Sequence, residues 1–371
     1  MARLLYLPFD QLHRERGVLA GAVSGRDRVV MVESERMLRA QRWHIQRLWF
    51  LITSARRFAQ LLRDEGFEVT YVSAPTTRDG ILHTIREGEE LWAAEQNSFR
   101  LTQTLTLLGA HWVENDFFLT PRSLFLDWAS SQKSHLMENF YRKQRQRLNI
   151  LMEGGKPIGG AWNFDSDNRK PLPKGYSFPP YHHHERDQLD RQVLEELEKY
   201  ETWGDAPDST WATSREGALA QAKNFFTNHF AHFGPYEDAM TNDNWAVHHS
   251  LLSPYLNNGL ILASEVVEMA LKEFDKGRVS IESCEGFIRQ IIGWREYING
   301  MYWFFGEKYR EENFFDARTP LLPLFDDPQA TKAACLSHIV SEIKNRAWVH
   351  HIPRLMVLSN IAIMTGINPI E

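Results

Sequence analysis

Two adjacent histidines near the end of the sequence, His350 and His351, carry side chains that can donate and accept protons near neutral pH. Apolar residues at helical spacing from Cys335 to Thr365 predict a buried helix or helix pair around them, with both imidazoles facing inward. Such a pair suits a site that handles a charged intermediate. The alternative is a pair of structural histidines in a core or at a helix end.

A second pattern places two hydroxyls three residues apart, at Ser250 and Ser253, just before Pro254. The proline marks a turn that feeds a helix. Hydroxyls and free N–H groups at a helix start suit a diphosphate, although the same pattern alone also describes an ordinary N-cap.

Aromatic residues are the third chemical signal. The chain has 12 tryptophans, and Trp245, Trp294 and Trp348 all fall in its second half. Clustered aromatic residues most often build cores and interfaces. They are also what a buried flavin and an electron-hopping chain require.

The elements that must position these residues differ between the two halves of the chain. Short apolar runs at residues 3–9, 28–32 and 67–73 read as buried parallel strands, and residues 44–65 read as a helix that ends at Gly66. This alternation predicts a doubly wound parallel sheet through about residue 125. The sequence has no Gly-x-Gly-x-x-Gly and no Walker loop, so this sheet is not an obvious dinucleotide or nucleoside triphosphate site.

The second half is predicted to be helical. Residues 156–180 are rich in Gly, Pro, Asn and Asp and read as a long ordered linker on the surface. Helical periodicity dominates from Glu185 onward. We therefore expect an α/β domain at residues 1–130, a linker with helices at 131–210 and an all-α domain at 211–371.

Composition limits the class of protein. With 371 residues, 43% hydrophobic and 24% charged, the chain can form two globular cores. It has neither a secretory signal pattern nor an apolar stretch long enough to span a membrane, so we expect a cytoplasmic protein. The net charge of −6 argues against a general polyanion binder but leaves room for a local basic face on DNA.

Metal ligands are sparse in the sequence. The 2 cysteines, Cys284 and Cys335, are far apart, so they cannot complete a zinc or iron–sulfur site. The run His182-His183-His184 follows two prolines in a polar stretch. We interpret it as a solvated loop, with chance metal binding as the alternative.

Four segments in order resemble the cryptochrome/photolyase family, and more narrowly the bacterial iron–sulfur cryptochromes and (6-4) photolyases. They are Phe233–Ala239, Ser250–Asn257, Glu285–Tyr297 and His350–Val357. The resemblance covers nearly the whole chain. It implies an α/β plus all-α fold: an N-terminal doubly wound parallel-sheet antenna domain, a long linker, and a C-terminal helical domain that binds FAD.

The resemblance also implies roles for individual residues. His350 and His351 match the histidine pair that transfers protons during repair, and Trp294 matches an aromatic residue that stacks on a flipped lesion. Where pyrimidine-dimer enzymes of the family place a lesion-contacting glutamate, this sequence has Gln290 or Ile291, which tilts the expected specificity toward the (6-4) lesion. The residues that match flavin contacts are Tyr236, Ser250, Leu251, Leu252, Ser253, Arg295, Trp348 and Arg354.

Further expectations concern the antenna and the DNA. A ribityl-lumazine antenna is implied, with Asp10, Gln11 and Glu33 as its contacts. UV-damaged DNA is the implied partner of a monomeric protein. The candidates for phosphate contacts, with solvated surface charges as the alternative, are Lys143, Arg145, Arg147, Arg169 and Lys170.

Some features depart from the family pattern. Cys335 matches the first of four iron–sulfur ligands, but the other three fall in a region that family members carry past the position matching Glu371. We therefore expect a helical domain that is incomplete and no [4Fe-4S] cluster in this chain. Pro353 replaces an expected glutamine and is predicted to kink its helix and remove one backbone bond.

Three functions remain compatible with the sequence. The first is light-driven electron transfer from reduced FAD that repairs (6-4) photoproducts, which the His350-His351 pair favours. The second is a blue-light receptor with the same flavin site and no repair. The third is a truncated, non-catalytic remnant, in which apolar residues such as Leu355 and Ile363 would be exposed.

Overall fold

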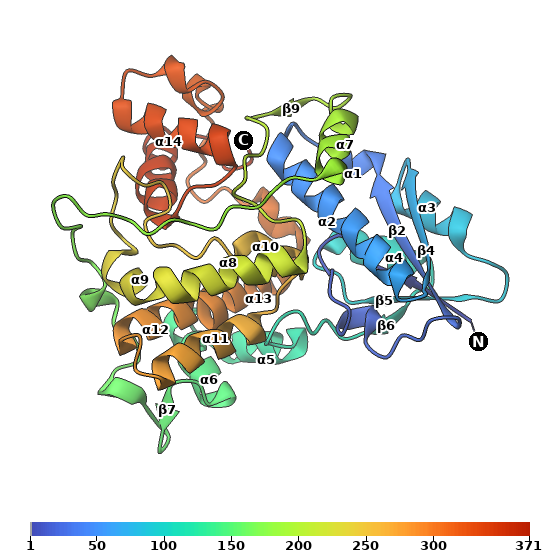
Figure 1. Cartoon of the computed structure of the whole chain (residues 1–371), viewed down its shortest axis with the longest axis horizontal. Helices are drawn as coiled ribbons and strands as arrows, with labels where there is room; N and C mark the ends of the chain where they lie inside the picture. Colours follow the sequence, from blue (N-terminus) through green and yellow to red (C-terminus); the bar gives the residue numbers. More distant parts are fainter. Residues whose placement is uncertain (1) are drawn as a thin grey trace. The chain divides into compact units, whose positions relative to one another are not determined.

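The computed structural model describes residues 2–371, which divide into two units (Figure 1). Unit 1 comprises the chain up to Pro121 together with His182–Gln221 and Leu252–Leu262. Unit 2 comprises Arg122–Tyr181, Ala222–Leu251 and Ala263–Glu371. The two units alternate along the chain, so contiguous domains with boundaries near residues 130 and 210 stay a prediction.

Unit 1 is built on a five-stranded sheet in the order β4-β2-β1-β5-β6, and its strands pair in parallel. This confirms the predicted parallel α/β domain. The order reverses beside β1, which is where parallel α/β sheets usually bind ligands. The strands are β1 (Arg3–Tyr6), β2 (Asp27–Ser34), β4 (Glu68–Ala74), β5 (Glu90–Ala94) and β6 (His111–Val113).

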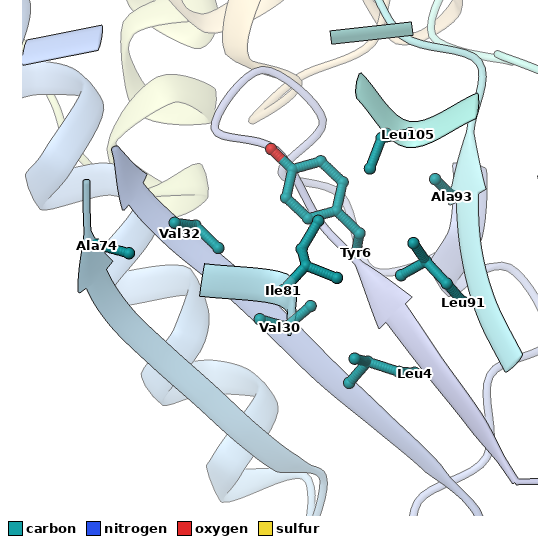
Figure 2. Packing of buried hydrophobic residues seen from close by; sticks show 9 residues of the cluster. All are labelled: Leu4, Tyr6, Val30, Val32, Ala74, Ile81, Leu91, Ala93 and Leu105. Carbon is teal, nitrogen blue, oxygen red and sulfur yellow. The ribbon is translucent and has the colours of Figure 1, made fainter. Parts of the chain in front are cut away.

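Helices cover the sheet on both faces because its strands are apolar on both sides. On one face α3 (Thr77–Thr84) and α4 (Phe99–Leu107) contribute Ile81 and Leu105 to a cluster with the alternate strand residues, as Figure 2 shows. The intervening residues, such as Val29 and Met31, are also fully buried. These intervening residues face the opposite side of the sheet. The long helix α2 (Ile45–Asp64) packs against β2 and β4 and belongs to that side. It matches the helix predicted at residues 44–65.

Smaller elements complete unit 1. A two-residue strand β9 pairs in parallel with β3, within the stretch that was predicted to be a linker with helices. The remaining elements are α1 (Glu35–Leu38), β3 (Trp43–His44), α7 (Gln188–Leu197), β9 (Thr202–Trp203), α10 (Ser253–Asn258) and the short 3-10 helix η1 (Gly17–Leu19).

Unit 2 is helical. Helix α8 (Arg215–Asn228) begins in unit 1 and ends in unit 2. The other helices are α5 (Arg122–Ser131), α6 (Met137–Leu148), α9 (Phe230–Tyr236), α11 (Ala263–Asp275), α12 (Ile281–Ile288), α13 (Glu296–Phe305), α14 (Ala334–Arg346) and α15 (Asn360–Met364). Short 3-10 turns are η2 (Ile158–Gly160), η3 (Asp165–Asp167), η5 (Glu307–Glu311), η6 (Pro323–Phe325) and η7 (Pro328–Ala330), and β7 (Met152–Glu153) pairs with β8 (Lys156–Pro157).

Two π-helical segments interrupt the helices of unit 2. The segment η4 (Arg289–Arg295) joins α12 to α13 without a break, and η8 (Pro353–Ser359) leads into α15. Such segments are rare and occur frequently at functional sites. Both carry residues that the sequence analysis selected.

The predicted linker is mostly irregular. Residues 168–187 carry no helix or strand, and the stretch before them has only short turns and the β7–β8 pair. Within residues 2–371, no helix is both long and apolar enough to cross a bilayer.

Candidate functional site

His350 is buried where the backbone reverses between two helices. Helix α14 ends at Arg346, and Ala347 adopts a left-handed conformation with φ of 57°. The side chain of His350 is only 4% exposed, and its Nδ1 atom has no hydrogen-bond partner among the described residues. Burial lowers the pKa of His350 to about 2, and the neighbouring His249, His351 and Arg354 act in the same direction. A neutral imidazole with a bare buried nitrogen can accept a hydrogen bond from a bound group.

His351 points the other way. The prediction that both imidazoles face inward is wrong, because His351 is exposed while His350 is buried. The helix begins at His351, and successive positions on a helix point about 100° apart. Burial lowers the pKa of His351, Arg354 adds to this, and Asp238 and Asp165 oppose it.

The prediction for Pro353 also fails. It lies at the start of η8, in the first turn of the helix, where a missing backbone N–H removes no helical bond. Proline here marks where the helix begins and does not kink its interior.

Aromatic rings line up beside His350. The ring of His249 lies 4.9 Å from that of His350 and 6.1 Å from that of Trp348. Trp348 packs edge-on against Trp245 at 5.2 Å, and the guanidinium of Arg346 lies over Trp245 at 5.0 Å. The structure therefore joins Trp348 and His350, both selected from the sequence, to His249 and Trp245.

The loop before α10 holds its backbone in unusual conformations. Val247, His248 and Leu251 all have positive φ, at 41°, 64° and 59°. Asn244 supports this loop through its Oδ1 atom, which accepts hydrogen bonds from the backbone N–H groups of Ala246 and Val247. Non-glycine residues in left-handed conformations store strain and cluster at ligand-binding sites.

The residues predicted to bind a diphosphate lie in and after this loop. Ser250 is half-buried and Leu251 and Leu252 are buried, while Ser253 is exposed and begins α10. Tyr236 is half-buried and ends α9 in unit 2.

The π-helical segment η4 carries the residues predicted to touch a lesion. Trp294 is 42% exposed, and its ring lies 6.1 Å from that of Tyr297. Gln290 is half-buried and donates a hydrogen bond to the carbonyl of Gly286. Arg295 pairs with the buried Glu296 at 3.0 Å, so its charge is compensated within the protein. Arg354, on η8, is exposed.

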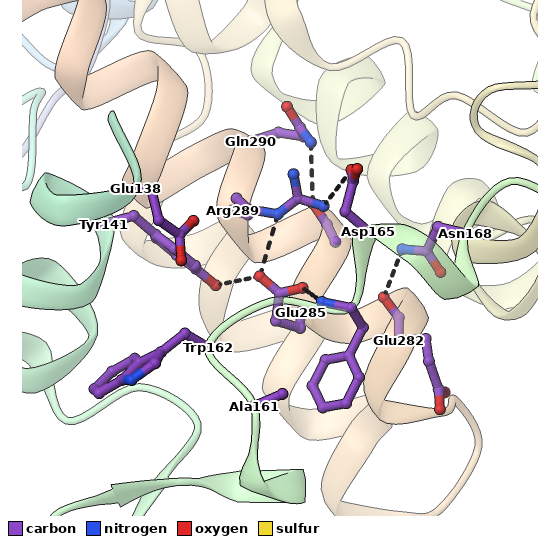
Figure 3. A network of polar contacts seen from close by, with 12 residues as sticks. Glu138, Tyr141, Ala161, Trp162, Asp165, Asn168, Glu282, Glu285, Arg289 and Gln290 are labelled. Carbon is purple, nitrogen blue, oxygen red and sulfur yellow. Dashed lines mark hydrogen bonds and ion pairs between the residues drawn. The ribbon is translucent and has the colours of Figure 1, made fainter. Parts of the chain in front are cut away.

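A buried polar network ties the linker to the helices of unit 2 (Figure 3). The carboxylate of Glu285 accepts hydrogen bonds from the hydroxyl of Tyr141 at 2.7 Å, from the backbone of Phe164 at 3.0 Å and from Arg289 at 3.2 Å. Arg289 also reaches Asp165 at 3.3 Å. Burial raises the pKa of Glu285, and Arg289 opposes this most strongly.

The network ends at the surface in Arg169. This exposed side chain pairs with Asp165 and lies 3.7 Å from Asp238. Lys170 is exposed beside it. The same aspartates oppose the lowering of the pKa of His351, so Asp165 and Asp238 share an electrostatic environment with this histidine.

One of the predicted phosphate contacts is wrong. Arg145 is fully buried, and its guanidinium donates to the carbonyls of Ile150, Leu151, Ala161 and Trp162. It therefore stabilises the chain after α6 and cannot reach DNA. Lys143 and Arg147, on the same helix, are exposed and stay candidates.

The predicted antenna residues of unit 1 gather near the carboxyl ends of β1 and β2. Gln11 is buried and donates to the carbonyl of Glu95, while its Oε1 atom has no partner among the described residues. Asp10 accepts a hydrogen bond from Asn97. The carboxylate of Glu33 already holds two donors, Arg56 and Tyr71.

Metal ligands do not gather in the part of the chain that the structure describes. No group of three or more His, Cys, Asp or Glu side chains in residues 2–371 is arranged to hold a metal ion. Cys284 is buried and Cys335 is exposed. The rings of His182 and His184 lie 4.7 Å apart, in the loop that the sequence predicted to be solvated.

No role was predicted from the sequence for Tyr176, Tyr181 or His229, nor for the imidazoles of His248 and His249. These rings form one cluster in unit 2, with Tyr181 stacked on His229 at 4.1 Å. The pair His248-His249 in a loop was a visible signal. Its partners lie about 20 and 70 residues away along the chain, a distance over which spacing carries no information.

Comparison with solved structures identifies the class of fold. A class III photolyase from Agrobacterium tumefaciens superposes on 99% of this chain and 74% of its own, with a TM-score of 0.66 and 16% identity. A cryptochrome from Synechocystis covers 100% of this chain and 76% of its own, with a TM-score of 0.67 and 15% identity. The whole chain thus has a photolyase-like fold, a parallel α/β unit combined with a helical one.

Sequence comparison then gives the family. The family model described as deoxyribodipyrimidine photo-lyase-related protein matches residues 5–211. The (6-4) photolyase of Agrobacterium fabrum is 31% identical over 385 residues, which span all of this chain and 76% of that protein. An uncharacterized protein of Acanthamoeba polyphaga mimivirus is 38% identical over 68 residues, 18% of this chain and 52% of its own. The chain belongs to the deoxyribodipyrimidine photo-lyase-related family.

Proposed function

We propose that this protein is a flavin-dependent photolyase that repairs (6-4) photoproducts in DNA under blue light. The observation that carries the proposal is 31% identity to a (6-4) photolyase over the whole chain. It is supported by the buried His350, whose bare Nδ1 atom lies within the segment that carries the family resemblance.

The residues in and beside the loop before α10 fit a flavin. The strained loop from Val247 to Leu251 turns backbone groups away from regular hydrogen bonding, as a diphosphate site requires. Ser250, Ser253 and Tyr236 would bind the phosphates, with Leu251 and Leu252 as loop contacts. Trp348, Arg295 and Arg354 would lie beside the ring system. When bound, a reduced flavin supplies an electron to the lesion under light.

The histidine pair divides the proton chemistry. His350 is held neutral by burial, so its Nδ1 atom would accept a proton or a hydrogen bond from the lesion. His351 is exposed and can exchange protons with water. We propose that His350 and His351 act as the acid/base pair, with His351 connecting the site to solvent.

DNA contacts would come from exposed side chains of unit 2. Trp294 offers 42% of its surface for stacking on an extruded base, and Gln290 lies on the same π-helical segment. Arg169 and Lys170 would contact phosphates, together with Lys143 and Arg147.

Unit 1 would carry the antenna. We propose that a ribityl-lumazine binds where the strand order reverses, with Asp10, Gln11 and Glu33 as contacts. The buried and unpartnered Oε1 atom of Gln11 supports this position. The sequence has 2 cysteines, Cys284 and Cys335, and a [4Fe-4S] cluster takes four thiolates, so an iron–sulfur cluster does not fit the residues present.

The test is a repair assay on two kinds of damaged oligonucleotide, one with a (6-4) photoproduct and one with a cyclobutane dimer. The purified, flavin-loaded chain should repair the (6-4) lesion under blue light and leave the dimer intact. His350→Ala should abolish repair while flavin photoreduction persists. The matched control His83→Ala replaces an exposed histidine of unit 1 and should leave repair unchanged.

The outcome also separates the alternatives. Flavin photoreduction without repair of either lesion would favour a blue-light receptor. Repair of the cyclobutane dimer would overturn the proposed lesion specificity. Loss of both photoreduction and repair in His350→Ala would assign His350 a structural role.

A further inference from the structure

Tyr176, His248 and His229 form a continuous hydrogen-bonded chain in unit 2 that the proposed function leaves without a role. The hydroxyl of Tyr176 lies 2.9 Å from Nε2 of His248. Nδ1 of His248 lies 3.2 Å from Nδ1 of His229, and Nε2 of His229 lies 3.4 Å from the carbonyl oxygen of Pro180. Both imidazoles are fully buried.

The carbonyl at the end fixes the direction of every hydrogen bond in this chain. A carbonyl oxygen can only accept, so Nε2 of His229 carries the hydrogen and Nδ1 of a neutral His229 is bare. Nδ1 of His248 must then donate to it, which leaves Nε2 of His248 bare. The hydroxyl of Tyr176 therefore donates to His248. These hydrogen bonds are therefore oriented to carry a proton from the phenol of Tyr176 to His248.

Both imidazoles are neutral at neutral pH, so each has one nitrogen without a hydrogen. Burial lowers the pKa of His248 to about 3, and its neighbours His229, His232 and His249 act in the same direction. Burial likewise lowers the pKa of His229 to about 4. No carboxylate contributes to the shift at either histidine. His248 is therefore neutral throughout the physiological range, and its bare Nε2 atom can take the proton of a phenol that loses an electron, because such a phenol becomes a strong acid.

An aromatic stack connects this chain to the tryptophans beside His350. Tyr181 stacks on His229 with ring centroids 4.1 Å apart and planes at 13°. It lies 6.1 Å from Trp245, which packs against Trp348 at 5.2 Å. The hydroxyl of Tyr181 donates to the carbonyl of His249, which cannot take up a proton. Of Tyr176 and Tyr181, it is therefore Tyr176 whose hydroxyl donates its hydrogen bond to a group that can take up a proton.

We propose that Tyr176 is a redox-active tyrosine that reduces an oxidised tryptophan of this stack, with His248 as the acceptor of its proton. One electron passes from the phenol to the radical cation of Trp245, which becomes neutral tryptophan again. The phenolic O–H bond breaks and its proton goes to Nε2 of His248. The products are a neutral tyrosyl radical and an imidazolium, whose Nδ1 proton can move on to His229.

The inference rests on the proposed function in one respect, the identity of the natural oxidant. That oxidant would be an oxidised flavin, which on excitation by light would remove an electron from Trp348 or Trp245. The step itself needs only a one-electron oxidant of tryptophan. A neutral tyrosyl radical would take an electron back from the reduced flavin more slowly than a tryptophan radical cation would, because its proton has already left. The charge-separated state would therefore last longer. The tyrosine would thus help to keep the flavin in its reduced form.

The test uses the full, flavin-free chain and azidyl radicals from pulse radiolysis, which oxidise tryptophan. In the wild type, the tryptophan radical signal should convert into a tyrosyl radical that is detected by transient absorption and by electron paramagnetic resonance. Tyr176→Phe should lose this tyrosyl signal, and the matched control Tyr181→Phe should keep it. The conversion should be slower in D2O and constant from about pH 5 to pH 8, because His248 titrates well below that range.

A second variant tests the base. His248→Ala should slow the conversion about a hundredfold, the lower end of what a positioned base contributes, and added imidazole should restore it. Tyr176→Phe keeps the ring and its packing, so it decides the question even if His248→Ala does not fold. An unchanged tyrosyl yield in Tyr176→Phe would overturn the inference. A radical at Tyr176 in the flavin-free chain would uphold it even if the protein repaired no DNA.

Discussion

Arg289→Met should destabilise unit 2 strongly, and the loss should depend on pH. The substitution removes the only cation that contacts the carboxylate of Glu285 in the described network and leaves its two neutral donors, Tyr141 and Phe164. Because the Glu285 side chain has no exposed surface, we expect a loss of about 3 to 5 kcal/mol in the free energy of unfolding, as for other broken buried ion pairs.

The sign of the pH dependence follows from the pKa of Glu285. Burial already raises this pKa in the folded protein, and Arg289 opposes the rise. Without the arginine the pKa of Glu285 in the folded state rises further. Between the ordinary pKa of a glutamate and this raised value, Glu285 is protonated in the folded state and ionised in the unfolded state. The stability of the Arg289→Met variant should therefore be greatest at low pH and should fall as the pH rises above that ordinary value.

The assay is urea unfolding followed by tryptophan fluorescence and circular dichroism at pH 5.5 and pH 8. The double variant with Glu285→Gln should recover much of the loss at pH 8, because a neutral amide then replaces the buried carboxylate that Arg289 contacted. The matched control Arg318→Met breaks an exposed pair with Asp316 and should change stability by less than about 0.5 kcal/mol. A loss in Arg289→Met that is equal at both pH values would refute the reasoning.

Three further predictions follow from single contacts. Gly80→Ala should destabilise unit 1 by about 1 to 3 kcal/mol in thermal unfolding, because an added Cβ would lie 2.6 Å from Val32, and the double variant with Val32→Ala should recover part of it. Arg354→Met should raise the pKa of His351 in an NMR titration, since the arginine lowers it; a fall would contradict the assigned cause. Arg169→Glu should weaken binding to DNA of any sequence and reduce the slope of affinity against salt, and an unchanged slope would exclude Arg169 as a phosphate contact.

The elements of the fold followed closely from the sequence. Helix α2 and strands β2 and β4 lie where periodicity and the glycine after the helix placed them, because the local pattern and the packing agree there. The pairing of β3 with β9 was missed. Two-residue strands leave no periodic signal, and this pairing joins positions more than 150 residues apart.

The site was less accessible to sequence reasoning because burial and orientation depend on tertiary packing. Arg145 resembled its exposed neighbours on α6, yet it is buried and saturated by carbonyls. His350 and His351 looked equivalent, but the start of the helix between them sends one inward and the other outward. Likewise, no spacing rule could join Tyr176 to His248, because only the fold brings them into contact.

The most direct test of the central claim is a titration of the purified 371-residue chain with FAD, followed by flavin absorbance after gel filtration. We predict one bound flavin per chain, and we predict that Ser250→Ala combined with Ser253→Ala weakens binding of FAD but not of riboflavin, which lacks the phosphates. A folded chain that retains no flavin at saturating FAD would contradict the account.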